Sequence, residues 1–199
     1  MPSISYAITA CNEHKELAFL LELLTNNIRQ EDEIMVQLDS NATEEVRQIA
    51  KDYLEFSLNK DFASFKNNLS KNCTKDYIFQ IDADEYPHPH LIANLADILE
   101  YNKTIDVFLI PRINTVSGLT EQHIQKWGWR VDDKGWVNFP DYQWRIWKNN
   151  GKIKWINKVH ERLDGFSEYS LLPQSEEYCL FHPKDITRQE RQNALYETI

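Results

Sequence analysis

The sequence predicts an α/β domain with a mostly parallel central sheet flanked by helices. Over the first half of the chain, short apolar strand segments alternate with helical segments, and this order implies parallel strands joined by right-handed crossovers. The strand predicted at residues 77–81 is rich in β-branched and aromatic residues and ends on Asp82-Ala83-Asp84. Ligands of open α/β sheets bind beyond the carboxyl ends of the strands. The acidic triplet therefore marks the expected site.

The elements of the first half follow from hydrophobic spacing. Segments suited to strands, rich in β-branched and aromatic residues, lie at 4–10, 34–38, 54–58 and 77–81. Segments suited to helices lie between them at 17–28, 43–53 and 63–71. The turn after the second strand, Asp39-Ser40-Asn41, can also cap the next helix.

The pattern changes after Pro87. We expect a helix at 91–101, a strand at 106–111, and then a long polar and aromatic loop or lid at 114–139. Asn149-Asn150-Gly151 lies between apolar segments at 143–148 and 152–157 and predicts a C-terminal β-hairpin. A capped, charged helix is expected at 185–199; it has no terminator, which is consistent with a chain cut from a longer protein.

Composition excludes several classes of protein. A length of 199 residues with 42% hydrophobic residues fits one globular domain with a sizeable core. The net charge of −9 disfavours nonspecific binding to nucleic acid or to an anionic membrane surface. The three scattered cysteines indicate free thiols in a reducing compartment. Because no transmembrane or signal segment is present either, we expect a cytoplasmic protein.

Crowded carboxylates at a strand end repel one another unless a cation lies between them. Hard oxygen ligands suit Mg²⁺ or Mn²⁺. Asp82 and Asp84 therefore suggest a metal-dependent enzyme that acts on a phosphorylated substrate. A solvated acidic turn is the alternative for an isolated triplet of this kind.

Five segments in order resemble the family 2 glycosyltransferases with the Rossmann-like GT-A fold of nucleotide-diphospho-sugar transferases. They are the loop 9–13, Asp39, the segment 59–67 with Lys66 in place of the usual Arg, the Asp-X-Asp motif 82–84, and the block from 141–147 through 159–161. The last block is similar to lipopolysaccharide-core-type and viral members. The resemblance implies one domain over 1–199, with a nucleotide-binding half at about 1–87 and an acceptor half at about 88–199.

The resemblance implies a nucleotide-sugar donor, with a UDP-sugar such as UDP-glucose favoured by family frequency. The expected donor-binding residues are Thr9, Ala10, Cys11, Asn12, Glu13, Asp39, Asn59, Phe62, Lys66, Asn67, Asp82 and Ala83. A divalent Mn²⁺ or Mg²⁺ would stabilise the departing diphosphate. Asp84 is the expected direct ligand, with Asp82 and His160 as further contacts; His160 is equally well explained as a surface histidine.

An inverting transfer of a hexose needs a base that takes a proton from the acceptor hydroxyl. Asp141 is the candidate, with Glu161 and Glu85 as rivals, and a plain turn residue is the alternative for Asp141. Trp127 or Trp129 could stack on a glycan acceptor, because sugar C–H faces pack on indole rings. A lipid-linked acceptor would bring peripheral membrane contact. The oligomeric state cannot be predicted.

Three other functions compete with this one. A haloacid-dehalogenase-like phosphohydrolase also has Asp-X-Asp after an apolar strand, but near the start of its domain. A nucleotidyltransferase usually opens with a glycine-rich loop, and residues 9–14 contain no glycine. A noncatalytic glycan- or nucleotide-binding domain on the same scaffold is the third.

Overall fold

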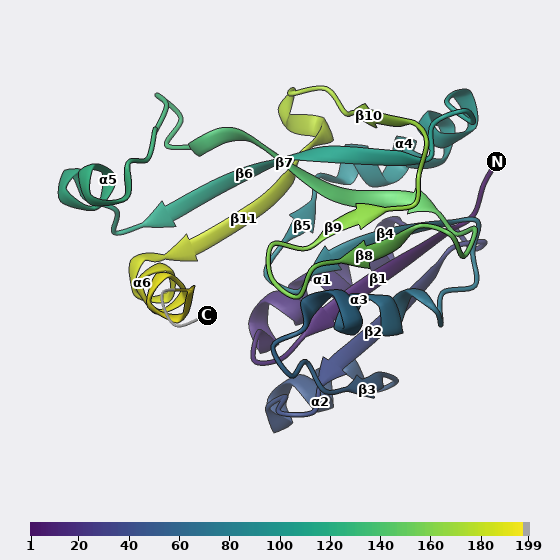
Figure 1. The fold of residues 1–199 in the computed structure, drawn as a ribbon, viewed down its shortest axis with the longest axis horizontal. Helices are drawn as coiled ribbons and strands as arrows, with labels where there is room; N and C mark the ends of the chain where they lie inside the picture. Colours follow the sequence, from purple (N-terminus) through teal and green to yellow (C-terminus); the bar gives the residue numbers. More distant parts are fainter. Residues whose placement is uncertain (197–199) are drawn as a thin grey trace.

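One large mixed sheet forms the centre of the molecule (Figure 1). The computed structural model describes residues 1–196, and within them nine strands belong to this sheet. The order is β3-β2-β1-β4-β7-β6-β11-β5, with β10 also paired to β6. The strands are β1 (Ile4–Ala10), β2 (Glu33–Asp39), β3 (Leu54–Phe56), β4 (Tyr77–Asp82), β5 (Tyr86–Pro87), β6 (Val107–Ser117), β7 (Val137–Lys148), β10 (Tyr169–Leu171) and β11 (Leu180–Asp185).

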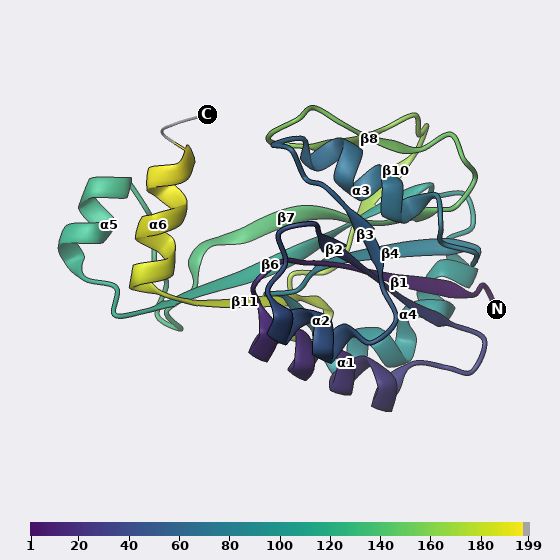
Figure 2. The same cartoon turned by 90° about the horizontal axis from the view of Figure 1, so that it is seen from below.

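Two layers cover the sheet, as Figure 2 shows. One face carries α1 (His14–Asn27), α2 (Glu44–Ala50) and α4 (Pro89–Tyr101). The other carries α3 (Phe62–Ser70) and a two-stranded antiparallel sheet of β8 (Lys154–Ile156) and β9 (Arg162–Asp164). A short 3-10 helix, η1 (Glu176–Tyr178), precedes β11.

Successive side chains of the central strands supply two separate cores. In β1, Tyr6 and Ile8 belong to the core that includes Leu17 of α1 and Leu95 of α4. Ala7 belongs instead to the core under α3, β8 and β9. Such alternation is expected when a strand is buried on both faces. The same rule explains why the predicted central strands are continuous apolar runs.

The mostly parallel α/β fold is confirmed. β1 pairs in parallel with both β2 and β4, and β2 pairs in parallel with β3. All four predicted strands and three predicted helices of the first half are present, with ends shifted by a few residues. The Thr43 hydroxyl caps α2 by accepting from Val46 N, and the Asp61 carboxylate caps α3 by accepting from Ser64 N.

The predicted hairpin around Asn149-Asn150-Gly151 is wrong. β7 already pairs with β4 along one edge and with β6 along the other, so neither edge is open to the segment that follows. The Asn149 side chain donates to the backbone oxygens of Cys73 and Lys75. The chain then passes to the α3 side, where β8 pairs with β9. The C-terminal hairpin is therefore one element later than predicted.

The predicted loop at 114–139 is also mostly ordered structure. β6 runs on to Ser117, α5 (Glu121–Trp127) follows, and β7 begins at Val137. We call residues 112–142 the arm, because the outer ends of β6 and β7 carry α5 away from the rest of the sheet (Figure 1).

The final helix, α6 (Ile186–Tyr196), lies beside α5. The last three residues of the helix predicted at 185–199 fall outside the described residues. No helix in the described part of the chain is both long enough and apolar enough to span a bilayer.

Candidate active site

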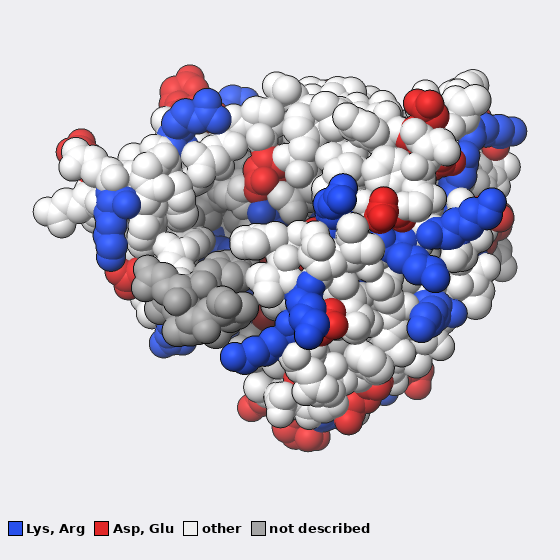
Figure 3. All heavy atoms as spheres, viewed as in Figure 1, with Lys and Arg blue, Asp and Glu red and all other residues white. Residues whose placement is uncertain are grey.

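A cleft of about 730 Å³ opens at the carboxyl ends of β1, β2 and β4. Figure 3 shows the surface hollowed between the arm and the rest of the molecule. The cleft brings together most of the predicted site residues: Thr9, Ala10, Cys11, Asn12, Glu13, Asp39, Phe62, Lys66, Asp82, Ala83, Asp84, His160 and Glu161. Their convergence follows from parallel pairing, which places the ends of these strands at one edge of the sheet.

The other predicted residues lie elsewhere. Asn59 accepts a hydrogen bond from the Ser57 hydroxyl, and the Asn67 side chain bonds both backbone groups of Trp155. Trp127 and Trp129 are on the arm, where their ring centroids are 4.7 Å apart. None of these four lines the described cleft. Asn67 therefore acts on the cleft indirectly, by fixing a tryptophan that does line it.

Asp39 ends β2 with both carboxylate oxygens engaged. Its Oδ1 accepts from the backbone and side-chain nitrogens of Asn41, and its Oδ2 accepts from Leu58 N at 2.7 Å. The carboxylate therefore ties the turn after β2 to the chain that follows β3. Asp39 is only 4% exposed, so its position in the wall of the cleft is well defined.

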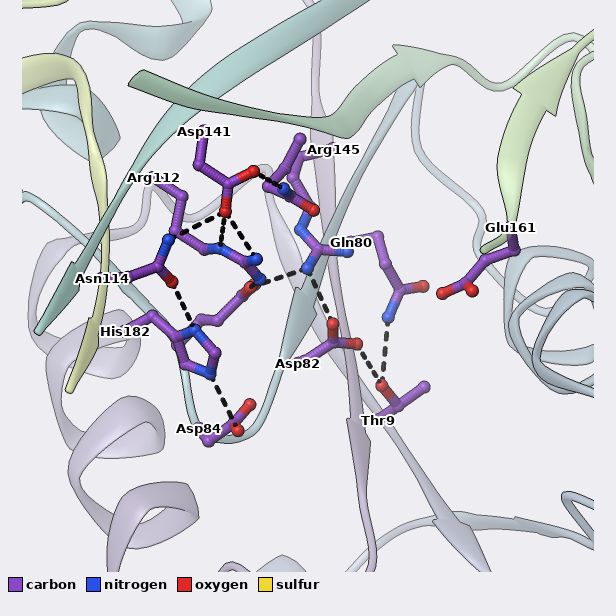
Figure 4. A network of polar contacts seen from close by, with 12 residues as sticks. Thr9, Gln80, Asp82, Asp84, Arg112, Asn114, Asp141, Arg145, Glu161 and His182 are labelled. Carbon is purple, nitrogen blue, oxygen red and sulfur yellow. Dashed lines mark hydrogen bonds and ion pairs between the residues drawn. The ribbon is translucent and has the colours of Figure 1, made fainter. Parts of the chain in front are cut away.

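Asp82 is held by hydroxyl, ammonium and guanidinium donors. Its Oδ1 accepts from the Thr9 hydroxyl at 2.9 Å and lies 3.3 Å from Lys66 Nζ, while its Oδ2 accepts from Arg145 Nη2 at 2.7 Å (Figure 4). Burial alone would raise the pKa of Asp82, but Arg145 and Lys66 outweigh it and hold the pKa well below its usual range. Asp82 is therefore ionised and fixed.

Asp84 has two nitrogen partners of its own, from a histidine and an arginine. Its Oδ2 lies 3.1 Å from His182 Nε2 and 3.1 Å from Arg188 Nη2. Burial would raise the pKa of Asp84; the hydrogen bond from His182 and the charge of Arg188 outweigh it and lower the pKa. Asp84 and Asp82 therefore have separate partners, which reduces their mutual repulsion.

A chain of alternating charges runs from Asp82 to the base of the arm (Figure 4). Arg145 Nη2 bridges Asp82 to Glu85 Oε1 at 2.7 Å, and the same Glu85 oxygen accepts from Arg112 Nη1 at 2.7 Å. Arg112 then binds Asp141 Oδ2 through Nε and Nη2, at 3.0 and 2.7 Å. We call Asp82, Arg145, Glu85, Arg112 and Asp141 the charge ladder.

Asp141 is also joined to His182. The Asn114 amide nitrogen donates to Asp141 Oδ2 at 2.9 Å, and Asn114 Oδ1 lies 2.8 Å from His182 Nδ1. Burial would raise the pKa of Asp141, but Arg112 and the bonds from Asn114 and Gln143 outweigh it and lower the pKa. Asp141 does not line the cleft itself; it lies behind Arg112 and Gln143, which do.

The opposite wall of the cleft contains a second ion pair. Lys66 Nζ lies 2.8 Å from Glu161 Oε1 and 4.8 Å from the centroid of the Trp155 ring. The Lys66 side chain is 5% exposed, so it is enclosed by acids and an aromatic face. This pair fastens the segment that contains His160 and Glu161 to α3.

The charges that line the cleft are balanced, although the chain as a whole carries −9. Of its described lining residues, six are acidic and six are basic: Glu13, Asp39, Asp82, Asp84, Glu85 and Glu161, against Lys66, Arg112, Arg145, Lys184, Arg188 and Arg191. The six basic groups offset the six acidic ones, so the cleft lacks the net negative charge that would repel a phosphorylated ligand.

Sequence reasoning missed His182, Asn114, Arg112, Arg145 and Arg188. Arg145 gave a usable signal, because a charged residue between Trp144 and Ile146 of an apolar strand must have a buried partner. His182 gave none: Phe181-His182-Pro183 matches no ligand spacing, and only the parallel pairing of β11 with β6 brings it to Asn114.

Comparisons with known proteins agree with this geometry. A family model described as Glycosyl transferase family 2 matches residues 5–170. The SPbeta prophage-derived glycosyltransferase SunS of Bacillus subtilis (strain 168) is 27% identical over 169 residues, covering 80% of this chain and 34% of that protein. Glycosyltransferase SunS of Bacillus phage SPbeta gives the same values. The chain thus spans about a third of the length of these curated relatives.

Solved structures show the same fold. The crystal structure of S. aureus TarS 1-349 superposes with a TM-score of 0.61 at 13% identity, covering 92% of this chain and 60% of that one. A second structure of that fragment, in complex with UDP, gives 0.61 at 14% identity with the same coverage. With the family match over residues 5–170, these findings show that the chain belongs to glycosyl transferase family 2 and has the GT-A fold.

Proposed function

We propose that this cleft binds a nucleotide sugar with a divalent cation and transfers its hexose, with inversion, to a hydroxyl of a glycan acceptor. The observation that carries the proposal is the meeting of Thr9, Asp39 and the Asp82–Asp84 motif in one charge-balanced cleft at the carboxyl edge of the sheet. A diphosphate needs both cationic groups and fixed donors near it. The cleft offers both.

The nucleoside would bind along the ends of β1 and β2. Asp39 would face the base, and Asp82, oriented by Thr9, would face the ribose. UDP is the first nucleotide to test, because TarS, which has the same fold, was crystallised with it. UDP-glucose is the corresponding first donor.

Asp84 and His182 are the residues that would hold Mn²⁺ or Mg²⁺. Because Asn114 donates to the Asp141 carboxylate, its oxygen faces His182 Nδ1 and can accept a hydrogen bond from that nitrogen. His182 Nε2 would then be the nitrogen that binds the ion, in place of its hydrogen bond to Asp84 Oδ2, and an imidazole nitrogen with a carboxylate oxygen is a suitable donor pair. When bound, the cation would stabilise the negative charge of the departing diphosphate.

Within residues 1–196, no three His, Cys, Asp or Glu side chains converge on a possible metal position. The protein would therefore supply two ligands, and phosphate oxygens and water would supply the others. We favour His182 over His160 as the nitrogen ligand, because His182 contacts Asp84 directly. His160 lines the same cleft and stays a candidate for a phosphate contact.

Asp141 is our candidate base. Its lowered pKa keeps the carboxylate ionised at neutral pH, and its Oδ1 accepts from Gln143 alone among the described residues, whereas Oδ2 has three donors. Glu161 is the rival: it lines the cleft, which Asp141 does not, and its Oε1 is paired with Lys66. Glu85 is buried between two arginines, which favours a structural role over proton transfer.

The arm would meet the acceptor. Trp127, the last residue of α5, and Trp129, just after it, are half-buried and offer adjacent indole faces to a sugar. A lipid-linked acceptor would bring the arm near a membrane surface. The three free cysteines favour the cytoplasm as the compartment.

The family match leaves a noncatalytic nucleotide- or glycan-binding domain as the alternative to test, rather than a phosphohydrolase or a nucleotidyltransferase. We would titrate UDP, GDP and several nucleotide sugars calorimetrically into the protein, with Mn²⁺ and with chelator. Metal-dependent binding of one nucleotide supports the donor site. Binding of none would overturn the proposal, and binding without turnover by any acceptor would support the noncatalytic alternative.

Two substitutions separate binding from chemistry. Asp84→Asn removes the anionic ligand and is expected to weaken metal-dependent UDP binding by about tenfold or more. Asp141→Asn is expected to leave UDP affinity within about twofold and to lower kcat by about 10²–10⁴-fold, the range for a general base. Asp97→Asn, an exposed acid on α4, is the control and should change neither. Full transfer by Asp141→Asn would exclude Asp141 as the base.

A further inference from the structure

Arg188 joins α6 to the metal-binding motif through three carboxylates. Its Nη2 lies 3.3 Å from Glu13 Oε1 and 3.1 Å from Asp84 Oδ2, and its Nη1 lies 3.1 Å from Glu16 Oε1. The start of α6 is fixed in turn, because Asp185 Oδ1 accepts from Arg188 N at 2.8 Å. The side chain lines the cleft and is 29% exposed.

The contact with Asp84 competes with the proposed cation. Both Arg188 Nη2 and His182 Nε2 lie 3.1 Å from the same oxygen, Asp84 Oδ2. A divalent ion bound to that oxygen at about 2.0–2.2 Å would lie close to the guanidinium. Two cations cannot share the site without strong repulsion, so the guanidinium would leave Asp84 when the ion binds.

Glu13 and Glu16 would keep the displaced guanidinium beside the cleft. Glu13 is the N-cap of α1, at the end of the loop at 9–13, and Glu16 lies in the first turn of that helix. Their contacts with Arg188 do not involve Asp84. Phosphate oxygens bound to the same ion would lie next to Asp84. The guanidinium N–H groups of Arg188 that have left Asp84 would lie there too. A planar guanidinium matches phosphate oxygens in geometry and in charge.

We infer that Arg188 is a ligand of the donor diphosphate. Its guanidinium contacts Asp84 in the free protein and moves to the phosphate oxygens when the cation binds. The inference depends on the proposed function, because it needs a metal-bound nucleotide in this cleft. Two other lining cations fit less well: Lys66 is enclosed by Asp82, Glu161 and Trp155, and Arg145 is buried between two acids.

The test measures two affinities that should move in opposite directions in Arg188→Ala. Mn²⁺ alone is titrated first, and its affinity should equal or exceed that of the wild type, because a competing cation has been removed. UDP is titrated next, with saturating Mn²⁺, and its affinity should fall about tenfold, as expected for loss of a charge-assisted contact. UMP, which lacks the second phosphate, should lose less than UDP.

Arg188→Lys and Lys103→Ala complete the design. Lysine keeps the charge without the planar fork, so it should give an intermediate loss of UDP affinity with an unchanged unfolding midpoint, and it carries the test if the alanine variant does not fold. Lys103 forms an exposed ion pair with Glu100 and does not line the cleft, so its removal should leave both affinities unchanged.

UDP affinity within twofold of the wild type in either Arg188 variant, or weaker Mn²⁺ binding by Arg188→Ala, would overturn the inference. If the wild type binds UDP with Mn²⁺ and the variants bind it equally well, the inference fails and the proposed function stands. If the wild type binds no nucleotide, both fail.

Discussion

Arg145 is the residue on which we expect stability to depend most. Its Nη2 contacts Asp82 Oδ2 and Glu85 Oε1, both at 2.7 Å, and the residue is 3% exposed. Arg145→Met keeps much of the side-chain length and removes the charge. Glu85, 1% exposed, would then have Arg112 as its single cationic partner among the described residues, and Asp82 would have Lys66.

The expected loss is about 3–5 kcal/mol in the free energy of unfolding, the usual cost of removing one partner from a buried ion pair. Since domains of this size are stable by about 5–15 kcal/mol, the variant should be close to its unfolding limit at neutral pH. Urea unfolding followed by tryptophan fluorescence would measure it, because Trp147 and Trp155 are both buried.

The loss should depend on pH in a definite direction. In the wild type the lowered pKa of Asp82 gives stability that is complete above about pH 4 and declines only as the pH falls through the folded pKa. Without Arg145, only Lys66 and the Thr9 hydroxyl oppose the effect of burial on Asp82, so the pKa of that carboxyl should rise above its unfolded value. The variant should then lose stability as the pH rises, so the difference from wild type should be smaller at pH 5 than at pH 7.5.

Lys103→Met is the control, since it removes a cation from an exposed ion pair with Glu100. It should produce little change at either pH. An unfolding free energy for Arg145→Met within about 1 kcal/mol of wild type, which is the net value of an ordinary hydrogen bond, would refute the argument. So would a loss of the same size at both pH values.

The remaining predictions concern packing and backbone. Phe79→Ala should lower the free energy of unfolding by about 3–5 kcal/mol, because the ring is fully buried in the core against α1 and α4. Phe19→Ala removes a side chain that is 51% exposed and should lower the free energy of unfolding much less. Equal losses in the two variants would contradict this prediction. Gly165→Ala should destabilise the protein more than Gly151→Ala. Both glycines have positive φ, 85° and 72°, but a Cβ at 165 would lie 2.5 Å from Lys152 O, whereas nothing lies within 4 Å of one at 151. Because both glycines have positive φ, the difference in urea midpoint between the two variants measures the steric clash at position 165. Equal midpoints would show that the backbone moves enough there to relieve the clash.

Much of the fold was predictable because its signals are local. Ile4–Ala10 and Tyr77–Asp82 are apolar on both faces, as strands inside a covered parallel sheet must be. The hairpin at Asn149–Gly151 failed for a nonlocal reason: the turn signal is present, but both edges of β7 are already paired. β6 was ended too early because Arg112 and Asn114 interrupt the apolar pattern, and their burial depends on partners distant in the sequence.

One part of the candidate site was predictable for the same reason. Thr9, Asp39 and Asp82 lie at the ends of predicted strands, so parallel pairing alone brings them together. The part formed by His182 and Arg188 was not, because His182 reaches Asp84 across 98 positions of sequence and Arg188 reaches Glu13 across 175. Such contacts depend on the path by which β11 and α6 return to the sheet, and no short sequence pattern predicts that path.

The charge ladder restricts how this sequence can vary. Each inner member, Arg145, Glu85 and Arg112, has a neighbour of opposite sign on both sides, so replacing one removes a counter-charge from two others. Neutral intermediates are therefore poorly tolerated, and a change at one position is expected to require a compensating change at its neighbour. The effects of single substitutions along the ladder should not add, because the loss of a second member partly relieves the charge exposed by the first.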